Sequence, residues 1–318
     1  MKTRSLILDT DMGSDVDDAL ALGLALASPE IDLVAVTTVS REPLVRARIA
    51  RKLLDLAGRR DVPVFTGSER SLSEGDAFVW FGNEGVGILE ADEPLAVEPE
   101  PAVDAMARLL RERDGLEVCA VGPMTNVAHL LARHPAAAAR IARLTIMGGH
   151  VRDVAYGGCS FPHGVDYNLC SDAAASLAVL RSDLPIRLVT ADVTLCTWIT
   201  PADVDRLAAH GGALQAALAR AVRAWTPVMR DIFSGMGATM GDDNAAFLHD
   251  PLALASVHDE SFCRFEDLAV EAVVRDGVFR TIEAARASEA TRTMRCATAV
   301  DAERFRAHVM ERLLRRAA

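Results

Sequence analysis

Residues 5–21 read SLILDTDMGSDVDDALA, and this stretch decides the fold. It opens with a short apolar run, Ser5–Leu8, which predicts a buried strand. A helical spacing of apolar residues begins at Asp17 and continues to Ala27, so the strand leads through a polar turn into a helix. Five of the ten residues from Asp9 to Asp18 are aspartates. We call residues 9–18 the acidic loop, and its charge needs an explanation beyond the fold.

The same alternation of apolar strand and helix recurs along the chain, which is typical of a mostly parallel sheet flanked by helices. Further strands are predicted at Leu33–Val39, Pro63–Thr66, Leu116–Val121, Leu144–Met147 and Ile186–Thr190, and further helices at Leu44–Ala57, Ala102–Arg111, Thr125–Ala132, Ser171–Leu180 and Asp301–Arg316. Two late runs, Leu268–Arg275 and Val278–Ile282, flank Asp276-Gly277, a strong hairpin signal. We predict one α/β domain over residues 1–318, with a Rossmann-like open sheet and a late antiparallel hairpin addition.

Composition narrows the class of protein. The 34 basic and 45 acidic residues give a formal net charge of −11, and no basic run is long enough to follow a phosphate backbone. The longest strongly apolar stretch, Ala19–Ala27, is too short to span a membrane. The six cysteines form no Cys-x-x-Cys pair and are interpreted as packing thiols. We therefore expect a cytoplasmic protein that binds neither nucleic acid nor membrane.

The acidic loop predicts a bound cation. Crowded carboxylates raise one another's pKa unless a positive charge compensates them. Capping and dipole interactions with the following helix would account for Asp15, Asp17 and Asp18, but Asp9 and Asp11 precede the turn at Gly13. A hard divalent cation, Ca²⁺ or Mg²⁺, is the simplest partner for such an all-oxygen set.

Several motifs then follow in a specific order, and together with the acidic loop they resemble the inosine–uridine-preferring nucleoside hydrolases. The shared pieces are Asp9-Thr10-Asp11-Met12-Gly13 with Asp17-Asp18-Ala19-Leu20-Ala21, Thr37-Thr38-Val39, Leu56-Ala57-Gly58, Val62-Pro63-Val64, Gly122-Pro123-Met124-Thr125-Asn126, Met147-Gly148-Gly149, Asp166-Tyr167-Asn168 and His249-Asp250-Pro251. The resemblance spans nearly the whole chain. It implies hydrolysis of the N-glycosidic bond of a nucleoside-like small molecule, a bound Ca²⁺, and a homodimer or homotetramer.

The resemblance also implies a role for each matching residue. Asp11 would ligate the metal and act as general base, with Asp18, Asp250 and the Val121 carbonyl as further ligands and Asp15 as a possible one; Asp17, Asn168, Asp166 and Ser160 would contact the sugar. His249 would protonate the leaving base or stack against it, a role that suits the ordinary pKa of histidine. Met124, Phe161 and Trp225 are candidates for the base pocket, although apolar residues more often belong to the core.

The chain departs from the family pattern mainly on the substrate side. Two residues are inserted in the acidic loop, so Asp15 is extra, and Ser40-Arg41-Glu42 replaces a Gly-Asn pair near the sugar. A histidine present in some members is absent from Phe81-Gly82-Asn83-Glu84-Gly85. Ser160 and Asp166 replace an asparagine and a glutamate that would face the 5′ end of the sugar. These departures predict a substrate that is not a plain nucleoside, or one that is bound differently at its 5′ end, and Arg41 is a candidate for admitting an anionic group.

Two other functions fit parts of the sequence. Asp9-Thr10-Asp11 also resembles the opening of the haloacid-dehalogenase-type Mg²⁺-dependent phosphatases, although no strand pattern precedes a second acidic element at Gly241-Asp242-Asp243-Asn244. A catalytically silent sugar-binding protein on the nucleoside hydrolase scaffold is the other alternative. Retention of Asp11, Asp18 and Asp250 argues against the silent protein.

Overall fold

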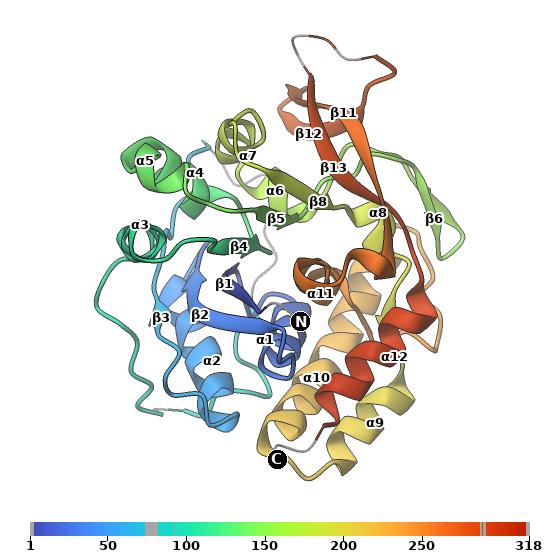
Figure 1. Cartoon of the computed structure of the whole chain (residues 1–318). Helices are drawn as coiled ribbons and strands as arrows, with labels where there is room; N and C mark the ends of the chain where they lie inside the picture. Colours follow the sequence, from blue (N-terminus) through green and yellow to red (C-terminus); the bar gives the residue numbers. More distant parts are fainter. Residues whose placement is uncertain (1–2, 74–81, 92, 287, 289–290, 316–318) are drawn as a thin grey trace.

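A large, mostly parallel sheet forms the centre of the molecule (Figure 1). The computed structural model describes residues 3–315, apart from 74–81, 92, 287 and 289–290. Within these residues the strand order of the large sheet is β12-β11-β13-β8-β5-β4-β1-β2-β3. The strands are β1 (Arg4–Thr10), β2 (Ile31–Thr38), β3 (Val64–Phe65), β4 (Glu117–Ala120), β5 (Leu144–Met147), β8 (Ile186–Val189), β11 (Cys263–Arg275), β12 (Val278–Glu283) and β13 (Thr291–Val300). Only the pairs that β11 makes with β12 and β13 are antiparallel in this sheet, as far as the structure describes it.

Helices cover both faces of the sheet. They are α1 (Asp17–Leu26), α2 (Pro43–Leu56), α3 (Ala102–Glu112), α4 (Thr125–Arg133), α5 (Pro135–Ala138), α6 (Tyr167–Ser171), α7 (Ala173–Leu180), α8 (Ala191–Thr194), α9 (Pro201–Ala209), α10 (Ala213–Gly235), α11 (His249–His258) and α12 (Ala302–Leu313), with a 3₁₀ turn at Glu260–Phe262. Two small sheets lie outside the large one: β6 (Val154–Tyr156) with β7 (Cys159–Phe161), and β9 (Trp198–Ile199) with β10 (Ala246–Phe247).

Strand β1 shows how the core is divided between the two faces. Side chains alternate along a strand, so Leu6 and Leu8 pack into the cluster on the side of α1, α2 and α9–α12, whereas Ile7 packs into the cluster on the side of α3, α4 and α7. All three are fully buried. An apolar strand buried on both faces is what the run Ser5–Leu8 predicted.

The predicted fold class is confirmed, and the predicted strands form within a few residues of their expected bounds. The hairpin at Asp276-Gly277 also forms, and both residues have positive φ angles, 53° and 75°, as a two-residue turn of this kind requires. The predicted helix Ser171–Leu180 corresponds to α7, which begins two residues later because Asp172 accepts a hydrogen bond from the Ala175 N–H as its N-cap. The short helix α6, which ends at Ser171, was not predicted. The last helix begins at Ala302 rather than Asp301, since Asp301 is its N-cap, and it ends at Leu313; the predicted end, Arg316, lies outside the described residues.

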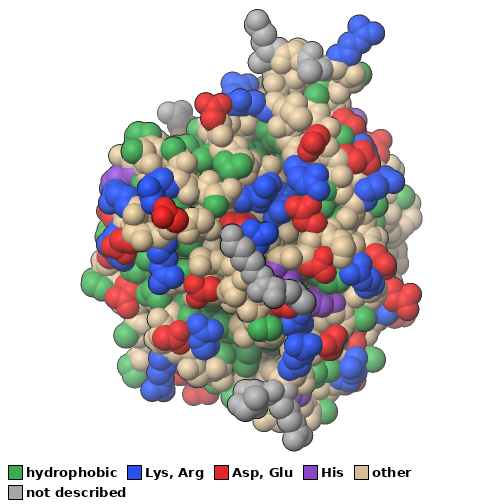
Figure 2. Space-filling model, viewed as in Figure 1, with side chains coloured by type: hydrophobic (Ala, Val, Ile, Leu, Met, Phe, Trp, Pro, Cys, Tyr) green, Lys and Arg blue, Asp and Glu red, His purple; other side chains and the backbone are tan. Residues whose placement is uncertain are grey.

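Helices α9 and α10 were not predicted. Pro227 lies inside α10, and a proline removes one backbone donor and reads in a sequence as a helix boundary. No helix among the described residues is long and apolar enough to cross a membrane. Figure 2 shows basic and acidic side chains lying next to one another over one face of the protein.

The carboxyl ends of the central strands place polar segments together. Strand β1 ends at Thr10 and runs into the acidic loop, β4 ends just before Val121, and β5 ends just before Gly148. These strands are neighbours in the sheet, and ligands of open α/β sheets bind at this edge. Gly122 permits the close approach: a Cβ atom added there would lie 2.7 Å from Asp11 Oδ1.

Candidate active site

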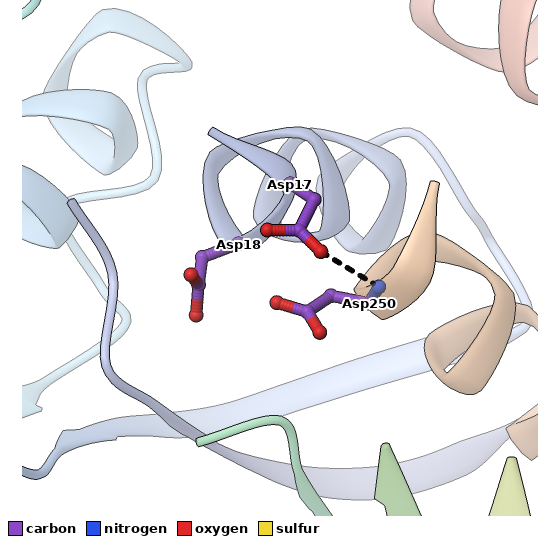
Figure 3. A group of neighbouring side chains, drawn as sticks. All are labelled: Asp17, Asp18 and Asp250. Atoms are coloured by element: carbon purple, nitrogen blue, oxygen red, sulfur yellow. Dashed lines mark hydrogen bonds between the residues drawn. The ribbon is translucent and has the colours of Figure 1, made fainter. Parts of the chain in front are cut away.

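Three buried carboxylates form a cluster between the first turns of two helices (Figure 3). Asp17 and Asp18 begin α1, and Asp250 lies in the first turn of α11. One oxygen of each carboxylate lies within 4.8 Å of the others, and none of the three residues is more than 4% exposed. Asp17 Oδ2 accepts a hydrogen bond from the Asp250 N–H at 3.2 Å, which fixes the two helix ends relative to each other.

Burial and mutual repulsion raise the pKa of all three carboxyl groups well above its ordinary value. For each group burial is the largest cause, followed by the charges of neighbouring aspartates. Buried like charges are costly unless a cation compensates them. Two oxygens bound to one Ca²⁺ at about 2.4 Å lie at most about 5 Å apart, so the spacing of the cluster fits a single ion of this kind.

Asp11 and the Val121 carbonyl lie beside this cluster rather than inside it. Both residues line the same cavity as the three carboxylates. Burial raises the pKa of Asp11, and the nearby Arg46 guanidinium opposes that shift. The Val121 carbonyl oxygen accepts a hydrogen bond from Asn168 Nδ2 at 2.7 Å, and a carbonyl oxygen has a second lone pair. The tightest group therefore contains Asp17, which the resemblance assigned to the sugar.

The two other aspartates of the acidic loop differ in their surroundings. Asp9 Oδ1 accepts hydrogen bonds from Thr37 Oγ1 at 2.6 Å and Asn126 Nδ2 at 2.8 Å, so Asp9 joins the ends of neighbouring strands. Burial raises the pKa of Asp9 to about 6 and that of Asp15 to about 7. Asp15 lines the cavity, and α1 begins after Val16 with no side-chain cap. Asp15 is therefore not the cap of this helix.

Arg46 on α2 is a buried cation next to the acidic loop that the sequence analysis missed. The residue is 1% exposed. Its guanidinium donates to the backbone carbonyls of Asp11, Met12, Ser40 and Arg41 and to Ser14 Oγ, and it lies 3.8 Å from Glu84 Oε1. Because one side chain holds all these groups, it fixes the backbone that presents Asp11.

A cavity of about 360 Å³ opens beside the carboxylates. A second part of its lining is apolar and largely aromatic, and we call it the aromatic wall: Phe161, Trp225, Met229, Ile232, Phe233, Met236 and Phe247. Phe233 lies 5.2 Å from Phe247 and 6.1 Å from Phe161, measured between ring centres. Phe161 and Trp225 thus lie where a base pocket was considered, whereas Met124 packs in the core on the other face of the sheet.

His249 lies at the junction of the carboxylates and the aromatic wall. Its Nδ1 shares a hydrogen bond of 2.6 Å with Thr194 Oγ1, and its ring lies 5.1 Å from that of Phe247. Burial lowers the pKa of His249 to about 4. The imidazole ring of His249 is therefore neutral near pH 7, and it adds no positive charge to the site.

The residues expected to contact the sugar are partly brought together. Asn168 Nδ2 also donates to the Met147 carbonyl at 3.1 Å, and Asp166 accepts the Leu169 N–H at 2.9 Å as the N-cap of α6. Burial raises the pKa of Asp166 to about 6. Ser160 on β7 is exposed and does not belong to the lining of the cavity. Phe81 lies outside the described residues.

The substituted segments lie behind the acidic loop. Ser40 and Glu42 have positive φ angles of 69° and 48°. The Ser40 and Arg41 carbonyls accept from Arg46, so this segment supports the loop from behind, and Arg41 does not line the cavity. Glu84 contacts Arg46 and Ser14. These substitutions therefore alter the support of the acidic loop.

Comparison with known proteins gives a consistent result. The family model for inosine-uridine preferring nucleoside hydrolases matches residues 6–307. The pyrimidine-specific ribonucleoside hydrolase RihA of Klebsiella pneumoniae (strain 342) is 34% identical over 257 residues, which cover 79% of this chain and 78% of that protein. Two solved structures are similar over 98% of this chain: a purine-preferring ribonucleoside hydrolase from Gardnerella vaginalis (TM-score 0.83, 28% identity, 98% of that chain) and a plant nucleoside hydrolase (TM-score 0.81, 25% identity, 99% of that chain).

Proposed function

The chain belongs to the inosine-uridine preferring nucleoside hydrolase family, and from that premise we propose that it splits a ribonucleoside or a close derivative into free base and ribose with the help of Ca²⁺. It is thus an N-glycosyl hydrolase. The observation that carries the proposal is the buried cluster of Asp17, Asp18 and Asp250 at the wall of a cavity of about 360 Å³. The aromatic wall of the same cavity supplies a surface on which a base can stack.

The proposed ligands of the ion are Asp11, Asp18, Asp250 and the Val121 carbonyl. An all-oxygen set supports Ca²⁺ rather than a transition metal. Asp17 uses one oxygen to accept the Asp250 N–H, and its other oxygen accepts a ribose hydroxyl. When bound, Ca²⁺ supplies the positive charge that compensates the carboxylates, and it makes a coordinated water more acidic.

The side chains of this chain divide the remaining work. Asp11, held by Arg46 through its backbone carbonyl, takes the proton from the attacking water. The carboxylates place negative charge beside the sugar as positive charge develops on it in the transition state. Asn168 and Asp166 hold the sugar. His249 contacts the leaving base at the edge of the aromatic wall and donates a hydrogen bond to it.

The deciding experiment measures reducing sugar released from a panel of purine and pyrimidine nucleosides, with and without a calcium chelator. We expect release that stops with the chelator and returns with added Ca²⁺. Cleavage that continues in the chelator would contradict the metal assignment. Release of inorganic phosphate from a phosphorylated substrate, with Mg²⁺ required, would favour the phosphatase, and binding of ribose without any cleavage would favour the silent sugar-binding protein.

The resemblance also supports a homodimer or homotetramer in the cytoplasm. Sedimentation equilibrium of the purified chain tests the oligomer, and cell fractionation tests the compartment. The two sets of relatives have names that point to different bases, pyrimidines for the sequence relatives and purines for one of the similar structures. The nucleoside panel therefore includes both classes of base.

A further inference from the structure

One end of the cavity is lined by three polar side chains that the proposed mechanism leaves wholly or partly unused, and we call it the polar end: His150, Asp166 and Arg280. His150 follows β5, Asp166 caps α6, and Arg280 lies on β12. The segments are tied together, since the Gly164 N–H donates to the His150 carbonyl at 2.5 Å and the Thr281 N–H donates to the Gly164 carbonyl at 3.1 Å.

Two atoms of the polar end are buried without a hydrogen-bond partner among the described residues. His150 is 3% exposed; its Nδ1 is 3.0 Å from the Val165 carbonyl oxygen, and its Nε2 has no hydrogen-bond partner. Asp166 is 8% exposed; its Oδ1 accepts the Leu169 N–H, and its Oδ2 has no partner. Both residues belong to the lining of the cavity. A buried polar atom that stays unpaired is destabilising, so two such residues in one lining indicate a ligand that supplies the missing hydrogen bonds.

Arg280 brings positive charge to the same place. It is the single lysine or arginine among the described residues that line the cavity. The side chain is half-buried along Gly164, where an added Cβ would lie 3.6 Å from Arg280 Nη1. Other arginines near this hairpin have acidic partners, as in Arg275 with Glu271 and Arg152 with Glu283. Within the described part of the chain no hydrogen bond or ion pair engages the Arg280 guanidinium.

We propose that the polar end binds an anionic group on the 5′ carbon of the ribose, so that the preferred substrate is a nucleoside with a 5′-phosphate or 5′-carboxylate. The proposal rests on the proposed function, because the family resemblance places Asp166 at the 5′ end of the sugar. Arg280 pairs with the anion through two parallel N–H donors. Asp166 Oδ2 accepts a sugar hydroxyl or a protonated oxygen of the phosphate.

His150 completes the arrangement. The Val165 carbonyl can only accept, so His150 Nδ1 carries a hydrogen. His150 Nε2 is then an acceptor, and it takes a hydrogen bond from a protonated phosphate oxygen or from a sugar hydroxyl. A lone 5′-hydroxyl would satisfy Asp166 or His150 and leave Arg280 unpaired, whereas an anion pairs with Arg280 as well.

The catalytic test compares base release from uridine, uridine 5′-monophosphate and uridine 5′-carboxylate in the presence of Ca²⁺. We expect kcat/KM to be at least about 10-fold higher for one of the anionic substrates than for uridine. Preference for the phosphate or for the carboxylate identifies the source of the charge. Arg280→Met should lower kcat/KM for the anionic substrate by about 100-fold and change it for uridine by less than about 2-fold.

Matched variants separate this effect from general damage. Arg275→Met removes an arginine from the same hairpin outside the cavity and should leave all three rates unchanged. His150→Phe keeps a ring of similar shape, removes Nε2, and should lower kcat/KM for the anionic substrate by about 10-fold. Wild-type enzyme that cleaves uridine as well as both anionic analogues, or an Arg280→Met variant that slows every substrate equally, would overturn the proposal.

A binding measurement keeps the two proposals separable. Calorimetric titration with ribose 5-phosphate and with ribose, both with Ca²⁺ present, should give at least about 10-fold tighter binding of the phosphate, lost in Arg280→Met. If Arg280→Met still binds ribose 5-phosphate more tightly than ribose, the difference would come from the metal alone. That result would contradict the assignment of the anion to the polar end. If no nucleoside is cleaved but Arg280-dependent binding of ribose 5-phosphate is found, the hydrolase proposal fails and anion binding stands.

Discussion

The two main walls of the cavity are built in different ways. The carboxylates follow a central strand or begin helices packed on the sheet, and none of Asp11, Asp17, Asp18 and Asp250 is more than 4% exposed. The aromatic wall comes instead from the small β6–β7 sheet, from β10 and from α10, and it includes Met236, which is 47% exposed. The carboxylates are therefore positioned by the large sheet and the helices packed on it, whereas the aromatic wall is carried by elements outside that sheet.

This difference separates chemistry from substrate choice. We expect changes among the carboxylates to lower the rate for every substrate in the same proportion. Changes in the aromatic wall should raise KM and alter the order of preferred bases. A carboxylate variant that changes the order of preferred bases would contradict this distinction between the two walls. So would an aromatic-wall variant that abolishes the cleavage of every nucleoside equally.

The largest effect is expected from Asp250→Asn. The variant removes one proposed ligand and should lower kcat/KM for all nucleosides by at least about 1,000-fold. Calorimetric titration should show loss of Ca²⁺ binding. In a chelator the variant should unfold at a higher temperature than the wild type, because one of three mutually repelling buried charges is gone.

Asp114→Asn is the control for Asp250→Asn, since the Asp114 carboxylate is exposed. It should leave activity, Ca²⁺ binding and unfolding temperature unchanged. Normal Ca²⁺ affinity in Asp250→Asn would remove this residue from the ligand set. A lower unfolding temperature in the chelator would mean that the cluster is not strained by its own charge.

The second effect concerns the support behind the carboxylates. Arg46→Met leaves several backbone carbonyls without their donor and removes the buried positive charge, so we expect a loss of about 3 kcal/mol in the free energy of unfolding. Arg46→Lys keeps the charge and should recover part of this loss. If Arg46 presents Asp11, the lysine variant should show a kcat lowered by about 10-fold with KM nearly unchanged.

Arg48→Met tests the same helix without touching the loop, because Arg48 donates to the Glu93 carbonyl. It should change the free energy of unfolding by no more than about 0.5 kcal/mol. It should change kcat by no more than the factor that corresponds to the same energy. If Arg46→Lys has wild-type kcat, the carbonyl contacts of Arg46 are structural only.

The carboxylate side could be predicted from the sequence more fully than the substrate side, where the resemblance led to Asp166, Asn168 and His249 but not to most of the aromatic wall. The strand Ser5–Leu8, the turn at Gly13 and the helix from Asp17 lie in one segment, and their periodicities specify a strand end followed by a helix start. The partner Asp250 is far along the chain, and only the family resemblance connected it with Asp18.

Arg46 was missed for a related reason. Its position on a predicted helix with several other arginines looks like an exposed charged face, and its burial becomes visible only once α2 packs behind the acidic loop. Arg280 and His150 were missed because β12 and the end of β5 are brought together by the late antiparallel addition, whose register no local pattern specifies.

His249 lies between the carboxylates and the aromatic wall. Variants of His249 therefore test whether this residue acts in the chemistry or in the choice of base. Its proposed role at the leaving base predicts that His249→Gln lowers kcat by about 100-fold for nucleosides, since a hydrogen-bond donor to the departing base is displaced. A p-nitrophenyl riboside has a leaving group that needs no protonation, so its cleavage should fall by less than about 3-fold. Equal losses on both substrates would assign His249 to the carboxylates instead. His258→Gln, at the other end of α11, is the control and should retain both activities.

The smallest effect is expected in the aromatic wall, at half-buried Phe161. Phe161→Leu keeps an apolar side chain but removes one ring from the edge-to-face contact with Phe233, and a stacked aromatic pair is worth about 0.5–1.5 kcal/mol. We expect KM to rise by about 5-fold with kcat unchanged, and the rise to be larger for purine nucleosides because they offer more ring area. Phe265→Leu on β11, partly buried and outside the cavity, should leave KM unchanged. A fall in kcat that is the same for every base would show that Phe161 helps to position the reacting bond, and the aromatic wall would then belong to the chemistry as much as the carboxylates do.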